Sequence, residues 1–319
     1  MEQRTSLVTG GTGGIGRAVA GRLAGAGDRV LVVGRNETRG QEVVGDLPRP
    51  HPYQLHTYLP ADLSLLADTV RLADAVAAHT ERLDSVVLCA GVFAGSPEWT
   101  SEGLERSFVL NYLSRFLVIQ RLLPLLGAAQ RPRLVLVASA GKYRDTLDLD
   151  AIGPGQAQRR RHLAGASQFA NDLLAVELSH RLRETGIEVA CVYPGVVRTE
   201  VFRNARGVPR PLQALAMMVQ RIVGTAPDAA ADTPAFLAQD PAARGINGHF
   251  YGPGRRQLEV PPRAAQPERR TALWQASERL VGQWLAGPPG EAGLRGESPR
   301  LTACPTSTAP AVGPVATES

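Results

Sequence analysis

Cysteines, aromatic residues and long apolar runs are all scarce in this chain of 319 residues. Three cysteines (Cys89, Cys191 and Cys304) are too few for a disulfide framework, so we expect a reducing, cytoplasmic location. Aromatic residues make up 5%, which is too little for base-stacking platforms, so no nucleic-acid partner is expected. No stretch approaches 18 uninterrupted apolar residues, which predicts no membrane span. No His/Cys cluster has the spacing of metal ligands, so we expect no metal site.

The composition does support a folded core. Hydrophobic residues make up 44% of the chain, enough for one large α/β domain or two ordinary ones. The net charge of +5 comes from 35 basic and 30 acidic residues, a modest excess that suits an anionic cofactor as well as any other anion.

Residues 287–319 differ in composition from the rest. They hold six Pro, five Gly, seven Ser/Thr and no aromatic residue. Such a segment cannot bury enough apolar surface to offset the entropy lost on ordering. We therefore expect a single folded domain at 1–286, followed by a disordered tail.

Short apolar runs alternate with helix-patterned segments along residues 1–286. The runs that predict strands are Ser6–Thr9, Arg29–Val33, Gln54–Leu59, Ser85–Ala90, Leu134–Ala138, Glu188–Tyr193 and Gly248–Tyr251. Several are Val/Leu runs without polar alternation, as expected for strands covered on both faces. The alternation predicts an α/β fold, a Rossmann-type doubly wound parallel sheet with helices on both faces in a single domain.

A glycine-rich turn follows the first predicted strand. It reads Gly10-Gly11-Thr12-Gly13-Gly14-Ile15-Gly16 and leads directly into a helix pattern. Glycines at such a turn let backbone N–H groups approach a pyrophosphate at the helix N-terminus. This strand–turn–helix context favours a dinucleotide site over a purely structural turn.

Two arginines decide which dinucleotide is expected. A site for NAD usually has Asp or Glu at the end of the second strand, to hold the ribose 2′-hydroxyl. This chain has Arg35 there, and Arg17 follows the last glycine of the turn. Guanidinium groups suit a 2′-phosphate, so NADP(H) is favoured over NAD(H). The alternative is that both are solvated surface arginines.

These features resemble the short-chain dehydrogenase/reductase family, in particular its retinol-dehydrogenase-like branch, over about residues 5–286. The family's glycine motif is matched by Thr9, Gly10, Gly14 and Gly16. The resemblance makes Asn111 the support of a proton-relay water and Ser139 the residue that orients the substrate. It also implies a homodimer or homotetramer, paired through helices near Leu104–Leu126 and Leu163–Leu182. Besides the glycines, the positions it assigns to the cofactor are Thr12, Ile15, Asp62, Leu63, Ala90, Gly91, Gln168, Pro194, Gly195 and Thr199.

The chain departs from the family at the two residues that carry its chemistry. The family uses Tyr-x-x-x-Lys on the helix after Ser139, where residues i and i+4 share one face. Ser167, Ala170 and Asn171 fix the register of this helix, so Ala164 occupies the tyrosine position and Gln168 the lysine position. No Tyr-x-x-x-Lys occurs anywhere in the chain. Ordinary carbonyl reduction by the family's route is therefore not expected, because neither residue is ionisable.

Two other side chains are candidates for proton transfer. Tyr143 lies four residues after Ser139 and beside Lys142, in a loop that we expect to border the site. His162 lies two residues before Ala164 and titrates near neutral pH. The alternatives are a surface tyrosine and a surface histidine.

Residues 195–225 are expected to form a substrate lid, as the corresponding stretch does in the family. Pro211–Val223 has apolar residues at helix spacing, together with Met217 and Met218, which suggests a small hydrophobic substrate. A packing or dimer helix is the alternative reading.

Three functions remain open from the sequence. The first is an atypical NADP(H)-dependent oxidoreductase acting on a hydrophobic carbonyl or alcohol. Proton transfer would then come from Tyr143, His162, water or the substrate. The second is a non-redox enzyme on the same scaffold, such as a cyclase, dehydratase or isomerase. The third is a catalytically silent protein that binds NADP(H) or a small molecule.

Overall fold

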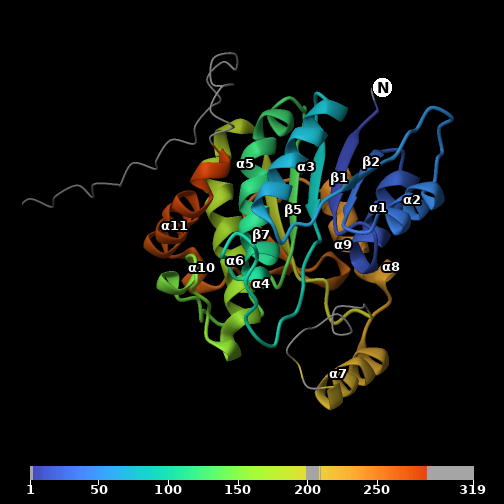
Figure 1. Cartoon of the computed structure of the whole chain (residues 1–319). Coiled ribbons are helices and arrows are strands. Elements are labelled where there is room, and N and C mark those ends of the chain that lie inside the picture. Colours follow the sequence, from blue (N-terminus) through green and yellow to red (C-terminus); the bar gives the residue numbers. More distant parts are fainter. Residues whose placement is uncertain (1–2, 199–207, 209, 286–319) are drawn as a thin grey trace, which may run out of the picture.

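A single eight-stranded sheet forms the centre of the molecule in this computed structural model, which describes residues 3–198, 208 and 210–285 (Figure 1). The strands are β1 (Thr5–Thr9), β2 (Arg29–Gly34), β3 (Thr57–Pro60), β4 (Ser85–Leu88), β5 (Arg133–Val137), β6 (Glu188–Val192), β7 (His249–Tyr251) and β8 (Gln257–Leu258). Their order is β3-β2-β1-β4-β5-β6-β7-β8, and only the β7–β8 pair is antiparallel. This order confirms the predicted doubly wound Rossmann-type fold.

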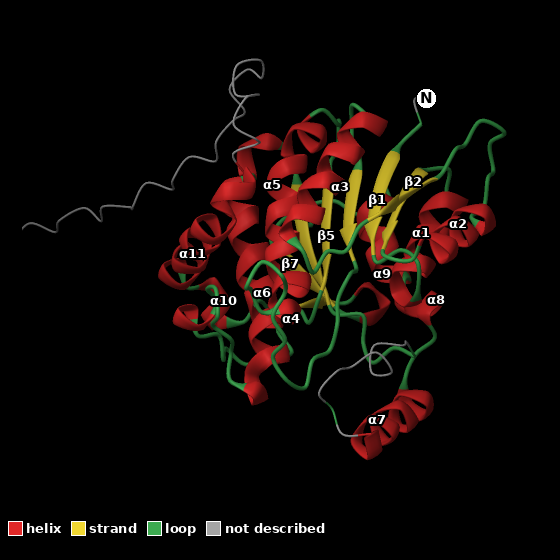
Figure 2. Ribbon diagram, in the orientation of Figure 1, coloured by secondary structure: helices red, strands yellow, loops and turns green. Residues whose placement is uncertain are grey.

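Helices cover the sheet on both faces (Figure 2). The α-helices are α1 (Gly14–Gly25), α2 (Glu37–Asp46), α3 (Leu66–His79), α4 (Arg106–Phe108), α5 (Ser114–Gly127), α6 (Leu163–Arg181), α7 (Arg210–Val223), α8 (Pro227–Ala230), α9 (Asp232–Gln239), α10 (Pro262–Ala265) and α11 (Pro267–Leu285). Short helical turns are the π-helix η1 (Val109–Leu113) and the 3₁₀ turns η2 (Leu149–Ala151), η3 (Arg160–His162), η4 (Arg183–Thr185) and η5 (Pro253–Arg255).

Alternation along each strand divides the core into two apolar layers. In β1, Leu7 packs with α3, α5, α6 and α11 on one face, whereas Val8 packs with α1, α2 and α9 on the other. In β4, Val86 and Val87 divide in the same way. Successive side chains of a strand point to opposite faces, so unbroken Val/Leu runs are what a sheet covered on both sides requires.

Two details differ from the sequence-based strands. The third strand begins at Thr57 rather than at Gln54, because the buried amide of Gln54 donates to the backbone carbonyls of Ala24 and Asp28 instead of extending the sheet. Strand β8 has only two residues, too few for a periodicity to be recognised.

One described stretch, Arg106–Gly127, is long and apolar enough to cross a membrane by length and composition. It consists of α4, η1 and α5, and 67% of its most apolar window is buried against the core. A buried core helix passes the same test, so this stretch is weak grounds for a membrane span.

The expected tail at 287–319 lies outside the described residues, as does part of the expected lid at 195–225. Within the described part of that lid, Arg210–Val223 forms the helix α7.

Candidate functional site

A cavity of about 1040 Å³ opens at the carboxyl ends of the strands. It runs from the glycine-rich turn after β1, past the ends of β4 and β5, to the turn after β6. The strand order reverses between β1 and β4, which is where ligands bind in doubly wound sheets.

The glycine turn forms one end of this cavity. Gly10 and Gly14 have φ angles of +66° and +51°, which favour glycine. A Cβ at Gly16 would lie 2.3 Å from the carbonyl oxygen of Gly10, so only glycine fits this close turn. Thr12 and Ile15 also line the cavity, as the sequence predicted.

The arginines at this end are Arg35 and Arg39, both of which line the cavity. A guanidinium nitrogen of Arg39 lies 3.3 Å from where a Cβ on Gly13 would stand. Arg17 does not line the cavity, because its exposed guanidinium pairs with Asp46 at 3.1 Å. Sequence reasoning missed Arg39; its signal was Asn36, whose side chain caps α2 by accepting from the Arg39 N–H.

The side wall of the cavity is made by the turn after β4. Ala90 and Gly91 line it, and the Ala90 N–H donates to the hydroxyl of Thr9 at 3.2 Å. Asp62 and Leu63 do not line the cavity. The Asp62 carboxylate caps its own turn by accepting from the backbone and hydroxyl of Ser64, and Leu63 is buried.

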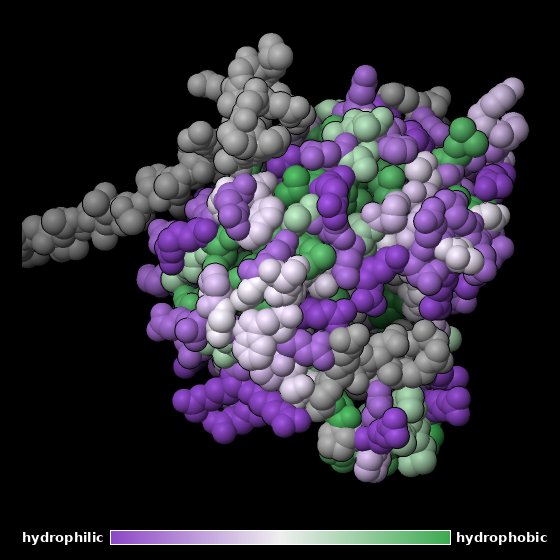
Figure 3. Space-filling model, in the orientation of Figure 1, coloured by the Kyte–Doolittle hydropathy of each residue, from purple (hydrophilic) through white to green (hydrophobic). Residues whose placement is uncertain are grey.

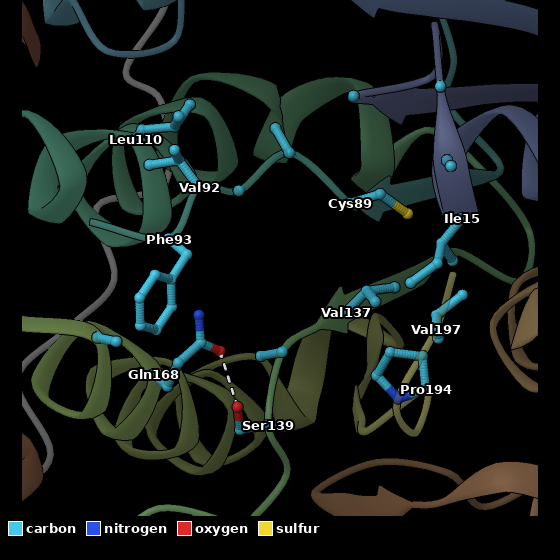
Figure 4. A pocket seen from close by; sticks show the side chains of 18 of the residues that line it. Ile15, Cys89, Val92, Phe93, Leu110, Val137, Ser139, Gln168, Pro194 and Val197 are labelled. Atoms are coloured by element: carbon cyan, nitrogen blue, oxygen red, sulfur yellow. Dashed lines mark hydrogen bonds between the residues drawn. The ribbon is translucent and has the colours of Figure 1, made fainter. Parts of the chain in front are cut away.

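The far end of the cavity brings together Ser139, Ala164 and Gln168; Figure 4 shows Ser139 and Gln168 side by side. Ala164 and Gln168 are four residues apart on α6 and line the same wall of the cavity. The Ser139 hydroxyl donates to Oε1 of Gln168 at 3.1 Å, and the amide nitrogen of Gln168 points into the open cavity. No ionisable group therefore occupies either position.

Lys142 and Tyr143 also reach this end of the cavity, from the loop between β5 and α6. Lys142 is the only lysine in the entire sequence, and its ammonium lies 5.5 Å from the centre of the Tyr193 ring. Tyr143 packs beside Gly165, which is next to Ala164. His162 does not line the cavity; its ring accepts from Arg161 at the start of α6.

The loop that carries Lys142 and Tyr143 has an unusual backbone. Ala140 has φ +39°, in the left-handed region that favours glycine, and Gly141 follows at φ +81°. The Gly141 N–H donates to the buried carboxyl group of Asp172 at 2.9 Å, and the Cys191 thiol donates to its other oxygen at 3.7 Å. Asp172 therefore fixes the turn that places Ser139 and Tyr143.

Asn111 lies in the π-helix beneath the cavity and does not itself line it. Its amide group bonds both the N–H and the carbonyl of Val92, and it also donates to Ser167. Its backbone carbonyl accepts from the side chain of Asn171 at 2.9 Å. Such π-helical turns occur often at functional sites.

A buried arginine, Arg115, also borders the cavity. It donates to the carbonyl of Ala90 at 2.8 Å and to the side chain of Asn171 at 3.2 Å, and its Nε has no partner. Among the described residues, no carboxylate lies within salt-bridge distance of it. Sequence reasoning missed Arg115, because nothing in an arginine one turn after Asn111 signals burial.

Burial shifts the pKa values of several groups here. It raises the pKa of Asp172 to about 7 and lowers the pKa of Arg115 to about 10. Burial, with a smaller effect from Tyr193, raises the pKa of Tyr143 above its usual value. Burial also raises the pKa of the Cys89 thiol to about 12, so this thiol on the cavity wall is not a nucleophile at neutral pH.

Pro194 and Gly195 line the cavity from the turn after β6, and Gly195 has φ +86°. Thr199 lies outside the described residues. The part of the chain that the structure describes contains no group of three or more His, Cys, Asp and Glu side chains able to hold a metal ion.

Comparison with known proteins agrees with this geometry. The family described as short chain dehydrogenase matches residues 4–147. Dehydrogenase/reductase SDR family member 13 from Homo sapiens is 34% identical over 94% of this chain and 78% of its own length. Retinol dehydrogenase 14 from Homo sapiens is 30% identical over 88% of this chain and 87% of its own.

Solved structures share the fold as well. The RhlG/NADP active-site complex from Pseudomonas aeruginosa aligns with a TM-score of 0.60 and 29% identity, covering 78% of this chain and 94% of that chain. With these relatives and this geometry together, the chain belongs to the short-chain dehydrogenase/reductase family, with relatives among the retinol dehydrogenases.

Proposed function

We propose that this protein is an NADP(H)-dependent oxidoreductase that interconverts a hydrophobic alcohol and its carbonyl compound, with Lys142 and Tyr143 replacing the family's pair. The observation that carries this proposal is one continuous cavity. It joins the glycine turn and two arginines at one end to Ser139, Lys142 and Tyr143 at the other.

The residues present fit the cofactor. The glycine turn leaves backbone N–H groups open to a pyrophosphate, and a Cβ at Gly13 would crowd Arg39. Arg35 and Arg39 would hold the 2′-phosphate of NADP(H). Ala90, Gly91, Gln168, Pro194 and Gly195 would line the nicotinamide half. When bound, the nicotinamide supplies or accepts the hydride.

Tyr143 is the proposed proton donor. Its raised pKa keeps the phenol protonated over the neutral pH range, which suits donation to a carbonyl oxygen. Lys142 adds a positive charge at the same end of the cavity, beside Tyr193. The amide nitrogen of Gln168 remains available to the ribose or substrate, because its oxygen is bonded to Ser139.

The lining near this end supports a hydrophobic substrate. Val92, Phe93, Leu110, Val196 and Val197 border the cavity, and Val92, Phe93 and Leu110 are grouped opposite Ser139 in Figure 4. An apolar wall with a few convergent polar groups is typical of sites for apolar small molecules.

The Ser139–Gln168 bond favours a second candidate, a binding protein or non-redox enzyme on the same scaffold. The serine already donates its proton to the amide, and no charged side chain of α6 faces it. The two candidates differ in whether bound NADPH is consumed.

Two measurements test the proposal. Titration by NADPH fluorescence should give saturable binding that weakens when Arg35 and Arg39 are both changed to serine. A panel of apolar ketones and aldehydes should then oxidise bound NADPH, with Tyr143→Phe lowering kcat by about 10²–10⁴-fold and leaving NADPH affinity unchanged. His162→Ala is the matched control and should retain activity. Binding without oxidation across the panel would support the silent or non-redox candidate, and absence of NADPH binding would overturn both NADP-based readings.

A further inference from the structure

Helix α7 is amphipathic in the reverse of the usual sense. Six of its apolar side chains are 46–71% exposed, namely Leu212, Leu215, Met218, Val219, Ile222 and Val223. At 100° per residue they fall within an arc of about 140°. The polar residue Gln220 is the one that is buried, and its amide donates to the carbonyl of Val197. The helix therefore contacts the rest of the protein through Gln220 and exposes its apolar face to solvent.

Such a face needs an apolar partner. Figure 3 shows apolar side chains on α7, which lies apart from the body of the molecule. Contiguous exposed apolar patches on a folded protein mark interaction sites, because water contact with them is unfavourable.

The charges on α7 indicate the kind of partner. Its only charged residues are Arg210 and Arg221, and it has no acidic residue. Both arginines fall on the flank between the apolar arc and the side that meets the body, at 100° per residue. An apolar face with arginines beyond one of its edges and no acidic residue suits a helix that lies in the headgroup region of an anionic bilayer.

A second basic segment lies at the same end of the molecule. Arg159 and Arg161 are exposed, just before α6, whose first turn borders the cavity at Ala164. Helix α7 is also at this end, because Thr225 pairs with Val197 after β6. Figure 1 shows α7 beyond the carboxyl ends of the strands. Positive charge and apolar surface therefore share the end at which the cavity opens.

We propose that α7 docks this protein onto an anionic lipid bilayer, with the mouth of the cavity at the membrane surface. Gln220 of α7 lines the cavity, as does Val196, which pairs with Thr225 just after α7, so docking brings the opening to the lipid. A hydrophobic substrate held in the bilayer then reaches the cavity without crossing water. This goes beyond the proposed function, since the docking requires no turnover.

A second copy of the chain fits this face less well. A helix of 14 residues is only about 21 Å long, and one of its faces is too small for the roughly 800 Å² per partner of a stable interface. Pairing two such faces would also bring two pairs of arginines together. A bilayer has neither limit, because each apolar side chain inserts independently and the arginines meet anionic headgroups.

Vesicle sedimentation with the full chain tests the docking. The probes are vesicles of phosphatidylcholine alone and vesicles with about 30 mol% phosphatidylserine. The wild type should sediment with the anionic vesicles, and high salt should weaken its binding. Leu215→Ser/Ile222→Ser should lower the partition coefficient by about tenfold or more, since two apolar side chains are lost from the buried face. Arg159→Ala/Arg161→Ala should reduce mainly the part of vesicle binding that high salt also removes.

The matched control is Tyr53→Ser/Leu55→Ser, which removes apolar residues that are 89% and 70% exposed. They precede β3, at the amino end of this edge strand, whereas α7 lies at the carboxyl ends of the strands. It should bind as the wild type does. All the changed side chains are exposed, and unchanged circular dichroism and thermal melting confirm that each variant is folded. The proposal would be overturned if the wild type did not sediment with anionic vesicles, or if the α7 variant and the Tyr53/Leu55 variant lost vesicle binding equally. An α7-dependent dimer in ultracentrifugation, without vesicle binding, would also overturn it. NADPH titration on the same samples separates this outcome from failure of the proposed function.

Discussion

Ser139 donates its hydroxyl proton to Gln168 across 3.1 Å, so the side chain expected to orient the substrate is bonded to the residue at the lysine position. An ammonium at position 168 could not accept this bond, and the serine hydroxyl would be released toward the substrate. The glutamine therefore changes the state of the serine as well as removing a charge.

Restoring the family pair should create or raise reductase activity. Ala164 and Gln168 line one wall of an open cavity, which leaves room for larger side chains. We expect Ala164→Tyr/Gln168→Lys to raise kcat for an apolar ketone by about 10²-fold or more, because a positioned acid with a nearby cation is gained. The measurement is NADPH oxidation under saturating cofactor.

Ala164→Phe/Gln168→Met is the control for that gain. It fills similar volume without an acid or a charge, so it should show no gain in kcat over the wild type. Equal activation by both double variants would attribute the gain to cavity filling instead.

Cofactor selectivity should depend on Arg35 and Arg39 and not on Arg17. Only the first two line the cavity, whereas Arg17 pairs with Asp46 at the surface. Changing each to serine should weaken NADPH binding by about tenfold per residue, consistent with loss of a charge-assisted bond, and should leave NADH binding almost unchanged. Arg17→Ser should leave the NADPH-to-NADH ratio of Kd values as it is. An equal effect of all three serine variants would contradict this assignment.

Arg115 should matter for the ligand and not for the fold. Its guanidinium is buried without a carboxylate partner in the described chain, and burial lowers its pKa. Removing an unpaired buried charge relieves its desolvation cost, which offsets the loss of the bonds to Ala90 and Asn171. Arg115→Met should therefore keep or raise Tm in the absence of cofactor, while NADPH affinity falls because a cation is lost from the cavity wall. A lower Tm with unchanged NADPH affinity would make Arg115 a purely structural residue.

Much of the fold was predictable from local pattern. The runs that form β1, β2 and β4 have consecutive Val and Leu residues because helices cover both faces of the sheet. Burial on both faces is therefore visible in the composition of these runs. Glycines 10, 14 and 16 mark a backbone that no other residue can follow, so the glycine turn at one end of the cavity was also predictable.

The other end of the cavity, with Ser139, Lys142 and Tyr143, was less predictable, because its geometry depends on contacts between distant segments. Arg115 has no local signal that separates a cavity arginine from a solvated one. The N-cap Asn36 marks Arg39 as part of the first turn of α2, but it does not show that the Arg39 side chain reaches the cavity. Lys142 and Tyr143 were visible in the sequence, but their position depends on a turn held by Asp172, thirty-one residues after Gly141. Likewise, the spacing of α7 predicted an apolar face, but not that the face points away from the body.

Asp172 should make folding stability depend on pH in an unusual direction. Its pKa is raised from 3.8 to about 7, chiefly by burial, so the folded state keeps a proton that the unfolded state has lost. Stability from this group is therefore present at low pH, falls as pH rises from about 4 to about 7, and stays low above that. The full effect is roughly 4 kcal/mol.

Asp172→Asn keeps the shape and an acceptor for the Gly141 N–H without the ionisation. Urea unfolding at about pH 4 and pH 8 should show the variant close to wild type at the lower pH and more stable at the higher one. Burial lowers the pKa values of His56 and His180, but both residues are common to the wild type and the variant, so the difference between the two proteins isolates Asp172. The same difference in unfolding free energy at both pH values would show that the carboxyl group does not titrate between them.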